Sequence, residues 1–299
     1  MIEVRDLQVR YGTRTVARVP ELDVAAGECV AIVGESGSGK STTLLSLLGL
    51  TEGAHVSGDI RVCGVDVLGA SPRRLREIRG ARVALVMQSP QAALSPTTRL
   101  GTLMRRALQL HGVDRPPKGE RPDGERADGE RPDGERPDGE RPDGERPDGE
   151  RAGGERADGE RRGGRLRGGL QEIMAEAVRA VMLDPEILRR YPHEISGGQA
   201  QRFAIALAIA LGAEVILADE PTSALDVTVQ AEVVGVLRRL REERGLALLL
   251  VSHDLALVST IADRVLVMKD GEVVETGPAA EVLAAPSHPY TRDLLEALP

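Results

Sequence analysis

The sequence predicts an α/β fold, and three short apolar runs indicate it. Residues 30–33 are rich in β-branched side chains, which is typical of a buried strand. Residues 214–218, which are apolar after Glu214, and residues 246–251 form runs of similar length. The stretch TTLLSLLGL, which follows the first run after a glycine-rich loop, predicts a helix. Strand, loop and helix in this order favour a sheet packed against helices.

The composition sets the size of the fold and excludes one class of partner. The chain has 299 residues, of which 41% are hydrophobic, so a sizeable core can form. Aromatic residues make up 1%, and the core is therefore predicted to be aliphatic. The net charge of −8 argues against a nucleic-acid-binding protein, which more often has a basic face. Cys29 and Cys63 lack metal-ligand spacing and are interpreted as ordinary thiols.

The apolar segments predict an intracellular chain that does not itself span a membrane. The N-terminal sequence MIEVRDLQVRYG has no apolar signal segment. The runs at 203–213 and 246–251 are shorter than the roughly 20 residues that a membrane-spanning helix needs. Docking on a membrane through another protein stays compatible with this sequence.

A pentapeptide of the type GERPD is repeated nine times over residues 119–163. Each of the six copies in 119–148 carries one net negative charge, which accounts for most of the total charge. The repeat has no apolar side chain larger than alanine, so we predict a disordered insertion over 115–168. A binding tail or a spacer is one interpretation. An expanded surface loop is favoured, because opposite charges alternate within each copy.

The loop after the first predicted strand fits the pattern G-x-x-x-x-G-K-[ST]. It reads GESGSGKS from Gly34 to Ser41 and lies between a strand and a helix, as this phosphate-binding motif requires. Glycines let the backbone N–H groups surround a phosphate, and the start of the helix adds partial positive charge. Lys40 is predicted to reach the β- and γ-phosphates, and Ser41 is predicted to ligate Mg²⁺.

Two later strands end in residues that could complete such a site. Asp219 and Glu220 follow the run at 214–218, where one carboxylate could support Mg²⁺ and the other could polarise water. Two exposed carboxylates at a strand end are the alternative interpretation. The third strand is predicted to end at His253, which could reach the γ-phosphate, although a lone histidine is usually structural.

Five motifs occur in an order that resembles the ATP-binding subunits of ABC transporters. GESGSGKST at 34–42 matches the phosphate loop, VMQSP at 86–90 resembles the glutamine loop, and ISGGQAQRF at 195–203 resembles the signature motif. ILADEPTSALD at 216–226 matches the acidic strand, and SHD at 252–254 stands in the place of the switch histidine. The resemblance covers nearly the whole chain except about 115–168.

The resemblance implies ATP and Mg²⁺ as cofactors and assigns catalytic roles. Glu220 would be the general base, His253 would bind the γ-phosphate, and Gln88 would contact Mg²⁺ and sense the membrane partner. Asp219 would support the metal together with Ser41, and Tyr11 would stack on adenine.

The resemblance also implies two groups of nucleotide-binding residues. One group is the phosphate loop, formed by Gly34, Glu35, Ser36, Gly37, Ser38, Gly39, Lys40, Ser41 and Thr42. The other would contact the ATP bound on a second subunit and consists of Ser196, Gly197, Gly198 and Gln199. Many relatives have Arg at the position of Ala200 and Phe at the position of Met87, but neither change removes a chemical group from the site.

Three further segments resemble the oligopeptide, dipeptide and nickel importer branch: QSPQAALSP at 88–96, YPHE at 191–194 and HPYT at 288–291. The resemblance implies one ATP-binding domain over 1–299, with an antiparallel β subdomain near the N-terminus. A helical subdomain over about 87–212 would carry the insertion.

The implied partners are other protein chains. They are a second ATP-binding subunit, identical or different, two membrane permease subunits and, indirectly, an extracytoplasmic solute-binding protein. The implied location is peripheral, at the cytoplasmic face of the cell membrane.

Three alternatives stay open at this point. The chain could serve an exporter. It could be a soluble ABC ATPase that acts on ribosomes or DNA, although such proteins usually carry two domains or a coiled coil. It could also be a nonfunctional paralogue in which the repeat disrupts the helical subdomain, against which the intact Lys40, Glu220 and His253 argue. The transported substrate is not encoded in these motifs.

Overall fold

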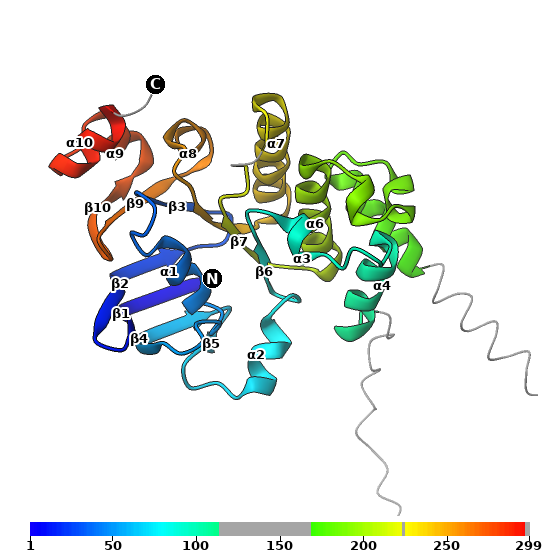
Figure 1. The fold of residues 1–299 in the computed structure, drawn as a ribbon, viewed down its shortest axis with the longest axis horizontal. Helices are drawn as coiled ribbons and strands as arrows, with labels where there is room; N and C mark the ends of the chain where they lie inside the picture. The colour runs from blue at the N-terminus through cyan, green and yellow to red at the C-terminus, as the bar shows by residue number, and fades with distance from the viewer. Residues whose placement is uncertain (114–168, 223–224, 297–299) are drawn as a thin grey trace, which may run out of the picture.

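The computed structural model describes residues 1–113, 169–222 and 225–296, and its centre is a ten-stranded sheet (Figure 1). The strand order is β5-β4-β1-β2-β10-β9-β3-β8-β7-β6. The strands are β1 (Ile2–Tyr11), β2 (Arg14–Val24), β3 (Cys29–Val33), β4 (His55–Val62), β5 (Val65–Asp66), β6 (Val83–Val86), β7 (Val215–Asp219), β8 (Ala247–Val251), β9 (Arg264–Lys269) and β10 (Glu272–Pro278).

The helices fall into two groups along the chain. Before the insertion they are α1 (Lys40–Ser46), α2 (Pro72–Ile78), α3 (Pro90–Ala93) and α4 (Leu100–Leu110). After it come helical residues 169–180, the short 3₁₀ helices Pro185–Arg189 and Pro192–Glu194, α6 (Gly197–Leu211), α7 (Val227–Arg244), α8 (Leu255–Ile261), α9 (Ala279–Ala284) and α10 (Pro289–Glu296).

Strands β9, β3, β8, β7 and β6 run parallel to one another and form the centre of the α/β architecture. Every residue of β3 and β8 is buried, as the unbroken apolar runs predict. Side chains of β3 alternate between two cores. Cys29, Ala31 and Val33 face a core shared with α4, α6, α7 and α8, whereas Val30 and Ile32 face α1 and the N-terminal strands.

The N-terminal strands β1, β2, β4 and β5 pair antiparallel, which confirms the predicted antiparallel β subdomain. This part joins the parallel strands through β2 and β10. Their pairing consists of one position, Glu272 with Arg18, supported by a hydrogen bond of 2.6 Å from Arg18 N to the Gly271 carbonyl. The sheet is therefore continuous across its two halves but narrowly joined at this point.

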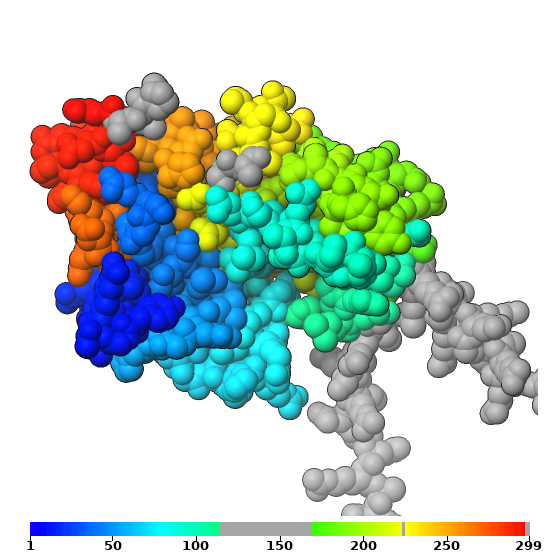
Figure 2. All heavy atoms as spheres, viewed as in Figure 1, coloured from blue at the N-terminus to red at the C-terminus, as the bar shows by residue number. Residues whose placement is uncertain are grey.

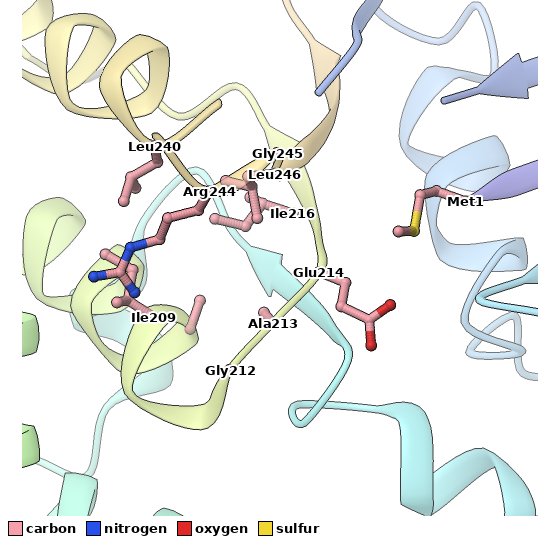
Figure 3. Close-up of a pocket in the computed structure, with 11 residues that line it drawn as sticks. Met1, Ile209, Gly212, Ala213, Glu214, Ile216, Leu240, Arg244, Gly245 and Leu246 are labelled. Carbon is pink, nitrogen blue, oxygen red and sulfur yellow. The ribbon is translucent and has the colours of Figure 1, made fainter. Parts of the chain in front are cut away.

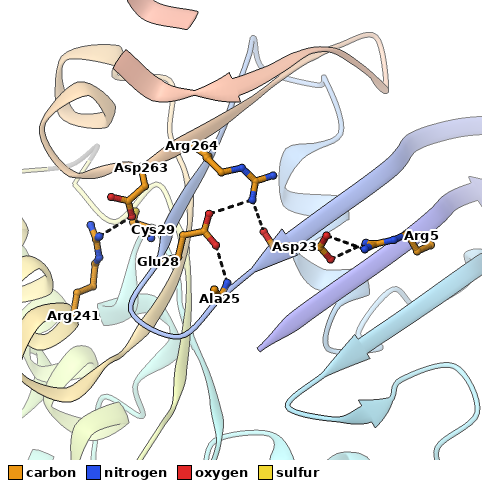
Figure 4. Close-up of polar contacts among 8 residues, drawn as sticks. All are labelled: Arg5, Asp23, Ala25, Glu28, Cys29, Arg241, Asp263 and Arg264. Carbon is orange, nitrogen blue, oxygen red and sulfur yellow. Dashed lines mark hydrogen bonds and ion pairs between the residues drawn. The ribbon is translucent and has the colours of Figure 1, made fainter. Parts of the chain in front are cut away.

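A set of polar contacts holds the connection between β2 and β3 (Figure 4). Arg264 donates to Glu28 Oε1 at 3.1 Å and to the Asp23 carbonyl at 3.2 Å. Asp263 accepts from the backbone N–H of Cys29 at 2.8 Å and from Arg241 at 2.6 Å. The first residue of β3 is thus fixed to Asp263, which directly precedes β9 and is itself held by α7.

Both cysteines are buried free thiols, in agreement with their interpretation as ordinary residues. Burial raises the pKa of the Cys29 thiol to about 12, so this thiol stays neutral.

The segments MRRALQLHG at 104–112 and QEIMAEAVRAVMLD at 171–184 flank the insertion, and their apolar spacing predicts two amphipathic helices, which the structure confirms. Helix α4 buries Leu100, Met104 and Leu108, which are spaced four residues apart along one face. Residues 169–180 are helical and bury Leu170, Met174 and Val178 at the same spacing. The space-filling view shows these segments at the end of the molecule opposite α10 (Figure 2). The insertion itself lies outside the described residues.

We expect that deletion of residues 119–163 leaves the melting temperature and ATP turnover close to those of the full chain. The tract offers no large apolar side chain to either core, and helix-to-helix connections typically need about 2–8 residues, fewer than remain after the deletion. Thermal melting, ATP turnover and trypsin digestion of both forms would be compared. A large fall in melting temperature would show that the repeat packs on the domain. Normal melting and turnover with lost transport would instead indicate a contact with membrane subunits.

In the described ranges no helix combines the length and the apolar character that crossing a membrane requires.

Candidate active site

The loop between β3 and α1 packs so closely on its neighbours that side chains are excluded at two positions. A Cβ on Gly34 would lie 2.1 Å from the Met268 carbonyl oxygen of β9, and φ at Gly34 is +147°. A Cβ on Gly39 would lie 2.4 Å from the Val16 carbonyl oxygen of β2, and φ at Gly39 is +98°. The glycines of the motif are therefore required by the fold as well as by any ligand.

Lys40, the first residue of α1, points back over this loop. Its ammonium donates to the Gly34 carbonyl at 2.8 Å and to the Glu35 carbonyl at 2.7 Å. The side chain is buried, and burial lowers the pKa of Lys40, while the nearby carboxylates of Glu220 and Asp219 oppose this shift. The ammonium is held inside the loop, where a phosphate group would provide stronger acceptors than two carbonyls.

Ser41 and Asp219 bring two oxygen ligands together from different elements. The Ser41 hydroxyl donates to Asp219 Oδ1 at 3.0 Å, which joins α1 to the end of β7. Burial raises the pKa of Asp219, and its hydrogen bond with Ser41 opposes the rise. Hydroxyl and carboxylate oxygens are ligands that Mg²⁺ accepts, so the donor set fits this ion.

The described residues hold no cluster of three His, Cys, Asp or Glu side chains that could bind a metal without further ligands. Mg²⁺ usually keeps several waters and takes phosphate oxygens of the substrate as ligands, so a site with few protein ligands suits it.

Gln88, Glu220 and His253 meet at one edge of the sheet. They follow the adjacent parallel strands β6, β7 and β8, whose carboxyl ends lie at the same edge as the loop after β3. Gln88 Nε2 donates to Glu220 Oε2 at 3.1 Å, and His253 Nδ1 lies 3.2 Å from Glu220 Oε1. The Glu220 carboxylate is thus contacted on both oxygens by side chains from the neighbouring strand ends.

One boundary prediction was wrong. Strand β8 ends at Val251, so His253 lies in the loop between β8 and α8 rather than at a strand end. Asp254 explains the break, because its carboxylate accepts from the Leu257 N–H at 3.0 Å and caps α8.

Glu220 has a left-handed backbone conformation, with φ at +46°. Such a conformation costs a non-glycine residue roughly 1–3 kcal/mol and is often found at functional sites. The N–H of Glu220 donates to the Val251 carbonyl at 2.9 Å, which compensates part of this strain and fixes the residue beside β8.

A pocket of about 270 Å³ lies beside the phosphate loop. It is lined by Ser36, Gly37, Gly39, Lys40, Ser41, Thr42 and Glu220, together with Arg14 and Val16 of β2. Arg14 and Val16 were not predicted from the sequence. Tyr11, by contrast, is 41% exposed at the end of β1 and does not line this pocket, so its contact with adenine stays a prediction.

The segment predicted to contact a second nucleotide begins helix α6. The Ser196 hydroxyl accepts from the Gln199 N–H at 3.2 Å, and the Gln199 side chain accepts from the Ser196 N–H at 3.0 Å. These reciprocal bonds form a capping box. Gly197 is exposed, whereas Gly198 is buried against α7. A Cβ on Gly198 would lie 2.2 Å from Val229 Cγ1 of that helix.

The start of α6 is not brought to the pocket beside the phosphate loop. No residue of 196–199 lines that pocket in the described part of the chain, and Figure 1 shows α6 and α1 on opposite sides of β6 and β7. The start of α6 is instead tied to the segment after β6, since Gln91 Nε2 donates to the Ile195 carbonyl at 2.7 Å.

A second cavity, of about 260 Å³, lies at the opposite ends of the parallel strands (Figure 3). Its lining comes from the ends of α6 and α7 and the start of β7, including Gly212, Glu214 and Leu246. Because the loop residues and Glu220 are at the other end of β7, this cavity is separate from the candidate active site.

The parallel sheet, the phosphate loop and the acidic strand end define a phosphate-loop ATPase. The family model described as ABC transporter matches residues 18–223, and the chain belongs to this family. It is 34% identical over its whole length to a probable peptide ABC transporter ATP-binding protein of Sinorhizobium fredii, of which 77% is covered. It is 36% identical over its whole length to a putative peptide import ATP-binding protein of Brucella ovis, of which 78% is covered.

A solved structure confirms the fold class. The dimeric structure of a bacterial ABC transporter cassette has a TM-score of 0.66 and 25% identity, and covers 93% of this chain and 99% of that chain. The predicted membership in the ABC ATP-binding subunits is therefore confirmed.

Proposed function

We propose that this chain binds ATP at the loop 34–42 and hydrolyses it with Glu220 as the general base, to power peptide import through separate permease subunits. One observation carries the proposal. The Glu220 carboxylate lies between Gln88 and His253, at the sheet edge that also holds the phosphate loop. A carboxylate beside a phosphate site, oriented by two neighbours, is suited to accept a proton from an attacking water.

Each side chain has a task in this mechanism. Lys40 exchanges its contacts with the Gly34 and Glu35 carbonyls for phosphate oxygens, which accept from an ammonium more strongly. Glu220 removes the proton of the water, while Gln88 and His253 hold the carboxylate and approach the γ-phosphate. Ser41 and Asp219 would hold Mg²⁺, which neutralises phosphate charge when bound.

The proposed site is completed by a second ATP-binding subunit, identical or different. The support is the position of the exposed start of α6, which does not line the pocket of its own chain. In a dimer, residues 196–199 of each chain would face the γ-phosphate held by the other. The relative with a solved structure is described as dimeric. One ATP-binding domain would then span 1–299, with the helical subdomain over about 87–212.

We expect Mg-ATP to drive association of two chains, because each nucleotide would contact both. Light scattering of the Glu220→Gln variant with and without Mg-ATP measures this directly, since slow hydrolysis keeps the dimer populated. A mixture with a second, co-expressed ATPase chain is the required companion experiment. If neither the single nor the mixed preparation associates, the shared-site arrangement is wrong.

Two membrane permease subunits and, indirectly, an extracytoplasmic solute-binding protein are the proposed further partners. With these partners, the chain would lie at the cytoplasmic face of the membrane.

Peptide is favoured over nickel complexes or export because the relatives in Sinorhizobium and Brucella are named for peptide transport or import. Uptake of labelled peptide and of ⁶³Ni by cells with and without the gene tests this choice. Gene-dependent nickel uptake without peptide uptake would reverse it, and unchanged uptake of both would favour an exporter or a non-transport ATPase.

A further inference from the structure

The C-terminal helix α10 contacts the phosphate loop through one buried side chain. Tyr290, which is 5% exposed, accepts a hydrogen bond of 3.0 Å at its hydroxyl from the backbone N–H of Glu35. The two residues are 255 positions apart in the chain. Burial raises the pKa of the Tyr290 phenol, so the hydroxyl stays protonated at neutral pH.

Tyr290 and Lys40 form hydrogen bonds with the same peptide unit, the one between Gly34 and Glu35. The Gly34 carbonyl accepts from the Lys40 ammonium, while the N–H of that peptide, on Glu35, donates to Tyr290. In a trans peptide the carbonyl and the N–H point in opposite directions, so the two partners lie on opposite sides. Gly34 has no side chain to restrict rotation of this peptide, so the two hydrogen bonds help to fix its orientation.

Tyr290 is itself held in place from several directions. The Lys269 ammonium of β9 lies 4.7 Å from the centre of its ring, as in a cation–π contact. The Tyr290 N–H donates to His288 Nδ1 at 3.2 Å. The Glu275 carboxylate of β10 accepts from the N–H groups of Ser287 at 2.7 Å and His288 at 3.2 Å, which fixes the start of α10. The hydroxyl is therefore positioned in advance rather than mobile.

We propose that Tyr290 is a positioning residue for ATP: its hydroxyl fixes the Gly34–Glu35 peptide and thereby the loop that receives the phosphates. It does not touch the reacting atoms. Without the hydroxyl this peptide can rotate, and a correctly shaped loop must then be selected from more conformations before a phosphate binds. The inference rests on the proposed assignment of ATP to the loop 34–42.

The test is Tyr290→Phe, which keeps the ring, its packing and its contact with Lys269 but removes the acceptor. We expect the Kd and KM for Mg-ATP to rise roughly 3- to 10-fold, as for the loss of one hydrogen bond, and kcat to stay within about twofold. Tyr191→Phe is the matched control, because the Tyr191 ring stacks on His193 at the start of a different helix. Loss of the Tyr191 hydroxyl should leave the Kd and KM for Mg-ATP unchanged. Melting temperature is measured for all three proteins.

The outcomes separate this inference from the proposed function. An unchanged Kd for Mg-ATP in Tyr290→Phe overturns the positioning role, whether or not the melting temperature falls. A rise in KM without a matching fall in kcat supports it. If the wild-type chain does not bind Mg-ATP, or if Lys40→Ala binds it as well as the wild type, the assignment of ATP to this loop is wrong, and the role of Tyr290 is rejected with it.

Discussion

Replacement of Glu220 with Gln is expected to lower ATP turnover by about 10²–10⁴-fold while ATP still binds. The amide keeps the size of the side chain and one of the two oxygens that Gln88 and His253 contact, but it cannot accept the proton of the attacking water. Turnover and equilibrium binding of Mg-ATP should be measured on the same preparation. Turnover equal to that of the wild type would remove Glu220 from the mechanism.

The matched control for this variant is Glu214→Gln at the other end of the β7 region. Glu214 forms two hydrogen bonds with Arg82, at 2.6 and 2.8 Å, and lies away from the phosphate loop. Loss of the Glu214 carboxylate should lower the stability of the fold only slightly, because its pair with Arg82 is partly exposed. ATP turnover should be unchanged. A comparable loss of turnover in both variants would point to a general effect of carboxylate removal on the fold.

Replacement of Gly198 with Ala is expected to destabilise the domain by about 1–3 kcal/mol. Alanine is favoured over glycine by up to roughly 1 kcal/mol within a helix, but at Gly198, the second residue of α6, the added methyl group would meet Val229 Cγ1 at 2.2 Å. The overlap is too large for the helix preference to offset it. The melting temperature should fall by several degrees, and the start of α6 should move relative to α7.

Two further variants isolate this overlap. Gly197→Ala places a methyl group on the neighbouring residue, where the nearest atom is at 3.6 Å, and should melt like the wild type. In a Val229→Ala background, Gly198→Ala should no longer lower the melting temperature. If it still does, the packing of α6 on α7 is not the reason for this glycine, and a nucleotide contact becomes its better explanation.

The sequence predicted those parts of the fold that depend on local patterns. The strand β3, the loop and the helix α1 follow one another within 18 residues, from Cys29 to Ser46, so an apolar run and a motif were sufficient. The helices beside the insertion were predictable from apolar spacing alone. The end of β8 was misplaced because Ser252 and His253 follow the apolar run directly, and the capping of α8 by Asp254 was not recognised.

Contacts between distant segments could not be predicted in this way. The roles of Gln88, Glu220 and His253 were implied by resemblance, but their contacts depend on the order of β6, β7 and β8 in the sheet. Tyr290 lies in the HPYT segment, which had no chemical interpretation of its own because its partner is the backbone of Glu35. Val16 lines the pocket at an irregularity in the pairing of β1 with β2, which no motif marks. The roles of these residues remain predictions to be tested.

A ligand in the pocket would link the two halves of the sheet across the narrow junction between β2 and β10. One residue pair joins the halves of the sheet, whereas β1 and β2 pair along nearly their whole length. The pocket spans this junction, with Arg14 and Val16 on one side and Lys40 on the other. A ligand that touches both sides adds its binding free energy to the cohesion of the two halves. A bound nucleotide would therefore add contacts across the narrowest part of the sheet, beside the apolar core that the two halves already share.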